Sequence, residues 1–365
     1  MAALIFKYSV PSSESNEALT MSTDAQDLAA VLHGSRDLRI EHIDRADVGA
    51  GQVRVQIDGV SLCGSDLHYY ADGRNGANVL TRPTVLGHEG FGRIVEVGDG
   101  VDTARLGERV AIEPAVPAPH TPLALAGHYN VDPSVVCFGS PPNNGLLRGS
   151  VVMPAAFAHA LPETVTDDVA ALIEPLAVAA WAASRAGSVL GKRVVITGAG
   201  PIGLLVLQTV LALGAREVTI TDVSQARLDV ALRLGASAAI LSGETAVEPA
   251  SAEVAFDCSG HPGAIADAAR ALGPAGVLLL VGVPGRQDAE FPIGLVQRWE
   301  LDIRGCFRYG PAAFEQAIGL AAQGRVDLRT LVTSRFSLAD SAAALEAALT
   351  DPTQLKIVID TGETR

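Results

Sequence analysis

The sequence predicts an α/β protein with a doubly wound parallel sheet in its second half and a smaller, mostly β domain in its first half. Two observations support this prediction. From Lys192 onward, strand patterns alternate with helix patterns. Between residues 28 and 110, short β patterns are instead separated by glycines. The chain has 365 residues, 48% of them hydrophobic, which is enough for two domains with their own cores.

In the first half, residues 53–57 and 92–98 alternate apolar and polar side chains, as half-buried strands do. Strands of this kind with glycine between them predict a small, mostly antiparallel barrel. Residues 111–150 are rich in Pro, Gly and Asn, so we expect long surface loops there.

In the second half, the apolar run 193–197 predicts a buried strand, and the helical spacing of 201–213 ends at Gly214. A second strand at 217–221 leads to Asp222, and a helix follows at 225–234. The remaining predictions are strands at 254–256, 277–281 and 301–304, helices at 314–323 and 338–349, and a closing strand at 356–359.

Composition excludes several functions. A formal net charge of −14, with 27 basic against 41 acidic residues, argues against nucleic acid as a partner. Gly and Pro interrupt every apolar stretch before the ~20 residues of a membrane span. The four cysteines contain no Cys-x-x-Cys pair, which argues against a disulfide framework and favours the cytoplasm. Residues 1–20 make a poor signal peptide, so we expect a disordered extension or a mis-called start, with Met21 as the more natural first residue.

A glycine loop joins the first strand and helix of the second half, with the sequence Gly198-Ala199-Gly200-Pro201-Ile202-Gly203. This pattern between strand and helix predicts dinucleotide binding, with the pyrophosphate at the helix N-terminus. Asp222 follows about 20 residues later at a strand end, where a carboxylate binds the adenosine ribose and favours NAD over NADP. Asp222 could also cap the next helix, and Arg227 could approach a 2′-phosphate or lie against the adenine.

Four side chains offer the ligand types that bind zinc and leave one coordination position open: Cys63, His88, Glu89 and Glu174. His88 and Glu89 are adjacent and would point to opposite faces of a regular strand. They can share one ion only if Gly87 and Gly90 bend the backbone. Each residue alone is more often structural, but two carboxylates in apolar surroundings are costly to bury without a cation.

Four motifs resemble the zinc-dependent medium-chain dehydrogenases, most closely the polyol dehydrogenases of the sorbitol and xylitol type, with L-idonate 5-dehydrogenases near by. These motifs are Cys63-Gly64-Ser65-Asp66-Leu67-His68-Tyr69-Tyr70, Leu86-Gly87-His88-Glu89-Gly90, Leu172-Ile173-Glu174-Pro175-Leu176 and the glycine loop. The resemblance implies a GroES-like catalytic domain at 21–175 and 310–365, and a Rossmann domain at 176–309. It also implies a homotetramer or homodimer that acts on a polyol or sugar acid with NAD.

The resemblance implies that Cys63, His88 and Glu89 bind one catalytic zinc with a water, and that Glu174 holds this water or enters the metal shell. Many relatives have a second, structural zinc bound by four cysteines, but residues 113–130 here contain none, so we expect one zinc per chain. Ser65 would take the substrate proton and pass it toward His68, although both could instead cap the turn near Gly64.

The resemblance also implies substrate contacts from Arg308 and Tyr309, and less strongly from Tyr69 and Ser140; each could instead lie at the domain interface. Val281 joins the glycine loop as an expected cofactor contact. Two rival readings remain open at this point. The chain could be a zinc-free cofactor-binding protein without enzyme activity, or its substrate could be L-idonate, another sugar acid, or a cyclitol or aminocyclitol.

Overall fold

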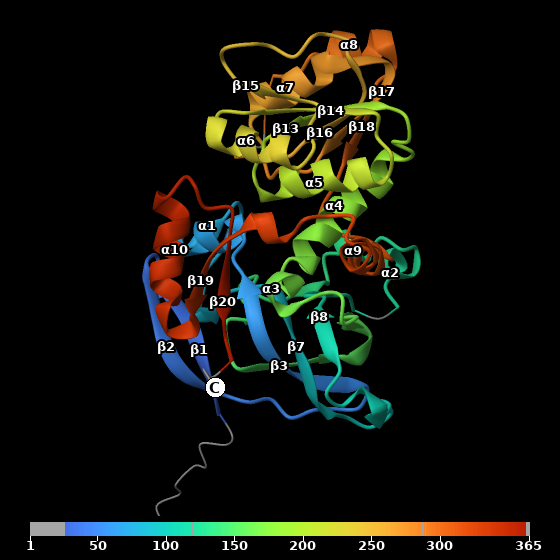
Figure 1. Ribbon diagram of the computed structural model, residues 1–365. Coiled ribbons are helices and arrows are strands. Elements are labelled where there is room, and N and C mark those ends of the chain that lie inside the picture. Colours follow the sequence, from blue (N-terminus) through green and yellow to red (C-terminus); the bar gives the residue numbers. More distant parts are fainter. Residues whose placement is uncertain (1–25, 119, 286–287, 289, 363–365) are drawn as a thin grey trace, which may run out of the picture.

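The structure is a computed structural model that describes residues 26–118, 120–285, 288 and 290–362 (Figure 1). The expected N-terminal extension, residues 1–20, and Met21 lie outside the described residues. Two large sheets dominate the described chain, a mostly antiparallel one and a parallel one. The predicted α/β class with a doubly wound sheet and a mostly β domain is confirmed.

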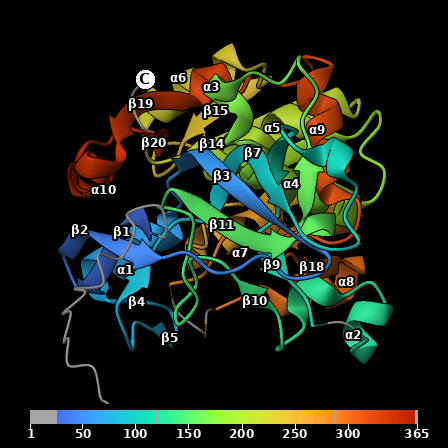
Figure 2. The ribbon, with the colours of Figure 1, turned by 90° about the horizontal axis from the view of Figure 1, so that it is seen from below.

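The mostly antiparallel sheet has seven strands in the order β12-β8-β7-β3-β20-β19, and β11 pairs with the other part of β3 (Figure 2). Only the β19–β20 pair is parallel. The strands are β3 (Gln52–Ser61), β7 (Glu89–Val97), β8 (Arg109–Ile112), β11 (Ser150–Pro154), β12 (Ala158–Ala160), β19 (Val332–Ser337) and β20 (Lys356–Asp360). The closing strand of the chain therefore lies beside a strand formed near its beginning.

Smaller sheets flank this one. They comprise β1 (Gln26–Gly34), β2 (Asp37–Asp44) and β6 (Thr84–Val85), then β4 (Arg74–Asn75) with β5 (Asn78–Val79), and β9 (Ala115–Val116) with β10 (Val136–Cys137). The prediction of surface loops at 111–150 was only partly right. This segment also holds α2 (Pro122–Leu125) and the completely buried Leu146 and Leu147. These two leucines pack in the β core, because apolar surface of that size is stabilised by leaving water.

The parallel sheet has the order β15-β14-β13-β16-β17-β18, and each neighbouring pair is parallel. This order, with the first strand near the centre, is that of the dinucleotide-binding Rossmann fold. The strands are β13 (Arg193–Thr197), β14 (Glu217–Asp222), β15 (Ala238–Leu241), β16 (Ala252–Asp257), β17 (Leu272–Leu280) and β18 (Asp302–Gly305). The helices between them are α5 (Pro201–Ala212), α6 (Gln225–Arg233), α7 (Pro262–Ala271) and α8 (Ile293–Trp299).

Helix α4 (Ile173–Ala186) lies between the two sheets and contacts both, touching β7 and β8 on one side and β17 on the other (Figure 1). It also packs on α5 and α9 (Ala313–Ala322). The other helices are α1 (Gly64–Asp72), α3 (Asp167–Ala170), α10 (Ser341–Thr350), η2 (Thr103–Arg105), η3 (Tyr129–Val131), η4 (Ala155–Phe157), η5 (Arg329–Leu331) and η6 (Leu338–Asp340). Within the described residues, every helix is too short or too polar to cross a bilayer.

Candidate metal and cofactor site

Three predicted metal ligands come together where α1 and β7 begin. Cys63 directly precedes α1, and Glu89 is the first residue of β7. One ligand atom from each of Cys63, His88 and Glu89 lies within 4.8 Å of the others. Such a group of thiol, imidazole and carboxylate is a donor set that zinc prefers.

Gly87 supplies the backbone bend that this arrangement requires. Its φ of +86° lies in the left-handed region that favours glycine, so His88 and Glu89 do not continue a regular strand. Gly90 acts differently, because its φ is not positive. A Cβ added at Gly90 would lie 2.8 Å from Cδ1 of Leu146, so this glycine permits close packing.

Asp66 fixes the two elements that carry the thiol and the imidazole. Its fully buried carboxylate accepts hydrogen bonds from the backbone N–H of Cys63 at 3.0 Å and of Gly87 at 3.1 Å. The same carboxylate lies 3.7 Å from Nδ1 of His88. Burial opposes the charge on His88, but the negative charges of Asp66 and Cys63 outweigh it and raise the pKa of His88.

Lys356 is a site residue that the motif analysis missed. Its buried ammonium group donates to both carboxylate oxygens of Glu89, at 2.6 Å to Oε1, and to the backbone carbonyl of Leu62 at 3.0 Å. The Ser61 hydroxyl donates to the same carboxylate. Burial opposes the charge on Lys356, but Glu89 and Cys63 outweigh it and raise the pKa of the lysine. The sequence does hold one sign of a buried lysine: Lys356 directly precedes the apolar residues Ile357-Val358-Ile359 of a strand.

Glu174 lies beside this group but outside the set of atoms within 4.8 Å. It is in the first turn of α4, is 7% exposed, and accepts a hydrogen bond from the Tyr309 hydroxyl. Burial, together with the charge of Glu89, raises the pKa of Glu174 to about 7. A carboxyl group with this pKa can hold or release a proton near neutral pH.

The donor set fits a divalent zinc ion. A carboxylate offers about four lone-pair sites. Lys356 and Ser61 take three of those on Glu89 in the contacts described above, which leaves one on Oε1 for a metal. A second buried carboxylate, Glu174, has an elevated pKa that a nearby cation would lower.

The glycine loop has the shape that a dinucleotide pyrophosphate requires. Gly198 has a φ of +94°, and a Cβ added at Gly203 would lie 1.8 Å from the carbonyl oxygen of Gly198, so only glycine fits either place. A Cβ at Gly200 would meet nothing within 4 Å, which leaves open space in front of the N-terminus of α5. Pro201 and Ile202 begin that helix.

Asp222 ends β14 and lines a cavity of about 680 Å³ together with Gly198. Its carboxylate accepts hydrogen bonds from the backbone N–H of Ala199 at 2.7 Å and of Ser224 at 2.8 Å. Asp222 therefore fixes the glycine loop as well as the start of α6. Arg227 is not among the described residues that line this cavity, and its buried Nε has no hydrogen-bond partner there.

The remaining predicted residues are distributed around these two centres. Ser65 and His68 lie one turn apart on α1, and the His68 side chain is 64% exposed and 3.7 Å from Asp72. Tyr69 is buried, and its hydroxyl accepts from Asn78 at 2.8 Å. Ser140 is half-buried after β10, and Val281 follows β17, where its N–H donates to Asp257 at 2.8 Å.

Arg308 is held by two neighbours. Its guanidinium lies 4.7 Å from the centre of the Phe307 ring, and its Nη1 lies 3.4 Å from the Asn130 carbonyl. The Asn130 side chain in turn donates to the Phe307 carbonyl at 2.8 Å. Tyr309 is only 1% exposed and packs edge-on against Phe314. Arg308 is therefore anchored from the segment that contains η3, whereas Tyr309 packs against α9.

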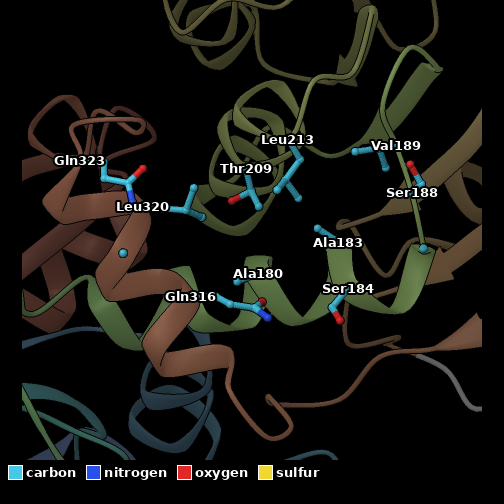
Figure 3. A pocket seen from close by; sticks show the side chains of 12 residues that line it. Ala180, Ala183, Ser184, Ser188, Val189, Thr209, Leu213, Gln316, Leu320 and Gln323 are labelled. Carbon is cyan, nitrogen blue, oxygen red and sulfur yellow. The ribbon is translucent and has the colours of Figure 1, made fainter.

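A separate cavity of about 590 Å³ lies between α4, α5 and α9 (Figure 3). Thr209, Ala183 and Leu320 face one another across it. No predicted site residue lines this cavity within the described chain. The predicted residue Glu174 lies instead in the first turn of α4.

Both halves of the chain are similar to known proteins. Residues 49–163 match the family model of the alcohol dehydrogenase GroES-like domain, and residues 201–323 match that of the zinc-binding dehydrogenases. Sorbitol dehydrogenase of Gallus gallus is 38% identical over 336 residues, which cover 89% of this chain and 94% of that protein.

Two further similarities are informative. A putative D-xylulose reductase of Agrobacterium fabrum is 37% identical over 325 residues, covering 86% of this chain and 92% of its own length. The crystal structure of L-idonate 5-dehydrogenase from Escherichia coli superposes with a TM-score of 0.85 at 30% identity. That superposition covers 92% of this chain and 98% of the other.

Proposed function

The chain belongs to the zinc-binding dehydrogenases, and on this premise we propose that it uses NAD to oxidise a secondary hydroxyl of a polyol to a ketose. The substrate would be of the sorbitol or xylitol type, and the reaction would be reversible. The observation that carries the proposal is the donor group of Cys63, His88 and Glu89. Similarity to sorbitol dehydrogenase over almost the whole chain supports the substrate class.

We also propose that catalysis and cofactor binding belong to two different domains. A GroES-like catalytic domain would comprise 21–175 and 310–365, and a Rossmann domain 176–309. In support, the seven-stranded sheet draws β19 and β20 from the C-terminal part of the chain, while the parallel sheet is confined to β13–β18. We further propose a cytoplasmic homodimer or homotetramer. All four cysteines carry free thiols, which fits a reducing compartment.

Cys63, His88 and Glu89 would hold one catalytic zinc per chain, with Glu174 orienting a water at the open position or entering the metal shell. When bound, zinc supplies a Lewis acid that lowers the pKa of the substrate alcohol. Asp66 contributes orientation, because its contacts with Gly87 and with the N-terminus of α1 fix the imidazole and the thiol. Lys356 prevents Glu89 from being an uncompensated buried charge.

Ser65 and His68 would move the proton that the alcohol loses. Residues three apart on a helix lie on one face, so Ser65 at the start of α1 and His68 form a path along that face. The His68 side chain is 64% exposed, which supports a path that would end in solvent. The nicotinamide ring supplies the hydride chemistry itself, and the protein supplies orientation and a site shielded from water.

Polyols should be oxidised far better than ethanol. Arg308, Tyr309, Tyr69 and Ser140 would offer a polyol hydrogen-bonding capacity beyond their contacts within the protein. A short alcohol would leave this capacity unused, at roughly 1–3 kcal/mol for each buried group. We expect oxidation at C2 of xylitol or sorbitol to a 2-ketose, measured as NADH formation across polyols, sugar acids and cyclitols. A preference for ethanol would contradict the polyhydroxy substrate.

Arg308→Ala should weaken polyol turnover more than NAD binding. Arg304→Ala is the matched control, because Arg304 lies on β18 and pairs with Asp302. An expected loss of about tenfold in kcat/KM for the polyol corresponds to one hydrogen bond to an ionic group. If both variants lost activity equally, the segment would act by packing rather than by substrate contact.

A second candidate substrate is L-idonate, because the L-idonate 5-dehydrogenase structure superposes closely and Arg308 can pair with a carboxylate as well as a hydroxyl. Related alternatives are other sugar acids and cyclitols. If the protein oxidised L-idonate or a cyclitol strongly and left xylitol and sorbitol unchanged, the proposed substrate would be a sugar acid or a cyclitol instead of a polyol.

Asp222→Ala should narrow the preference for NAD over NADP, because it removes a carboxylate that repels a 2′-phosphate. It should also weaken NAD binding, since the Ala199 and Ser224 N–H groups lose their acceptor. The measurement is kcat/KM for both cofactors. A wild-type preference for NADP would make Arg227 the deciding residue instead.

A further inference from the structure

The cavity next to Asp222 is acidic. Three carboxylate side chains line it, namely Asp222, Glu244 and Asp267, while no lysine or arginine does so within the part of the chain that the structure describes. His261 also lines it, and its Nδ1 accepts a hydrogen bond from the Gly263 N–H at 3.2 Å.

The three carboxylates differ in how their charge is compensated. Asp222 accepts two backbone N–H hydrogen bonds. Asp267 pairs with Arg270 at 2.9 Å. For Glu244 the described residues provide neither an ion pair nor a side-chain hydrogen bond, and the residue is exposed at the cavity wall. No described residue therefore neutralises its charge, which acts on whatever occupies the cavity after screening by water.

The sheet register fixes Glu244 close to the ribose position. Asp222 pairs with Leu241 across β14 and β15, and the Ser242 N–H donates to the Asp222 carbonyl at 2.8 Å. The Glu244 N–H then donates to the Leu241 carbonyl at 3.3 Å. This turn places Glu244 three residues beyond the partner of Asp222, on the same edge of the sheet.

We infer that Glu244 is a second determinant of cofactor choice, which disfavours the 2′-phosphate of NADP independently of Asp222. The inference rests on the proposed function, in that this cavity receives the adenosine half of NAD. A 2′-phosphate brings between one and two further negative charges. Repulsion between like charges across a partly hydrated cavity reduces affinity and weakens with added salt. Glu244 should therefore preserve a residual NAD preference in Asp222→Ala.

The role of Glu244 can be tested by measuring nucleotide binding directly, in the absence of zinc and of substrate. The probes are AMP and adenosine 2′,5′-bisphosphate, which differ only in the 2′-phosphate, and calorimetry on the full chain gives both Kd values. Glu244→Gln removes the charge and keeps the shape. The matched control is Glu248→Gln, because Glu248 is exposed and lies outside the cavity lining.

We expect Glu244→Gln to lower the ratio of the bisphosphate Kd to the AMP Kd by about three- to tenfold at low salt, as removal of one partly screened charge should. The shift should shrink in 0.5 M salt, where the Debye length is only about 4 Å. Glu248→Gln should leave the ratio as in wild type.

An unchanged ratio in Glu244→Gln, with AMP still bound more tightly than the bisphosphate, would overturn the role of Glu244 and leave the NAD proposal standing. Equal shifts in both variants would also overturn it, because the effect would then be one of net charge. If wild type binds neither probe, the adenosine site itself is wrong, and the inference falls together with the proposed cofactor.

Discussion

Replacing Cys63 with alanine is expected to abolish zinc binding and lower kcat/KM for polyols by more than about a hundredfold. Loss of a residue that only supports a metal ligand costs about 10–100-fold in affinity or activity, and Cys63 would be a ligand itself. The thiol lies within 4.8 Å of the donor atoms of His88 and Glu89, so its removal leaves two protein ligands. The measurements are zinc per chain by elemental analysis and initial rate.

The matched control is Cys306→Ala, since Cys306 is another half-buried free thiol that does not belong to the donor group. It should retain about one zinc per chain. A strong chelator should reproduce the Cys63→Ala result in wild type, with turnover lost and circular dichroism preserved, because extensive hydrophobic cores hold the β domain and the parallel sheet without the ion. A Cys63→Ala protein with stoichiometric zinc and full activity would refute the ligand assignment.

Replacing Lys356 with methionine should destabilise the fold by about 3–5 kcal/mol in zinc-free protein, measured by urea unfolding. Removing one partner of a buried ion pair costs this much, because the other charge is left uncompensated. Lys356 is 3% exposed and Glu89 1%, so water cannot replace the ammonium group. Only the Ser61 hydroxyl remains as a described donor to that carboxylate.

Lys192→Met is the natural control, because Lys192 is the other lysine in the described chain and is only half-buried. Its change in unfolding free energy should stay within about 0.5 kcal/mol. Zinc should reduce the penalty of Lys356→Met, since the ion offers Glu89 another cation. Equal stability of the two zinc-free variants would show that the ion pair contributes nothing.

Local sequence patterns predicted most of the nucleotide-binding half. The strand at 193–197 and the start of the helix at 201 agree with β13 and α5, because a buried parallel strand, a glycine loop and an apolar helix leave distinctive local signals. The family resemblance is confirmed by the sorbitol dehydrogenase relatives. The strand β15 was missed, since Ala238-Ala239-Ile240-Leu241 is too short and too rich in alanine to differ from a helix segment.

The site was predicted less completely, because some of its interactions join distant segments. The ligand motifs named Cys63, His88 and Glu89, and the bend expected at Gly87 is present. Lys356 carries no motif, and its partner lies 267 positions earlier. The role proposed for Glu244 has no local sequence signal either, since it depends on the register between β14 and β15.

The pairing of β20 with β3 also sets an order of events during synthesis. Glu89 leaves the ribosome 267 residues before Lys356, which at about 5–20 residues per second is a delay of roughly 13 to 53 s. The whole parallel sheet is translated within that interval. The nucleotide-binding segment can therefore fold while the β domain still lacks β19 and β20 and holds an unneutralised carboxylate. The last-made strand of the described chain then completes the first-begun domain, and with it the surroundings of the proposed metal ligands.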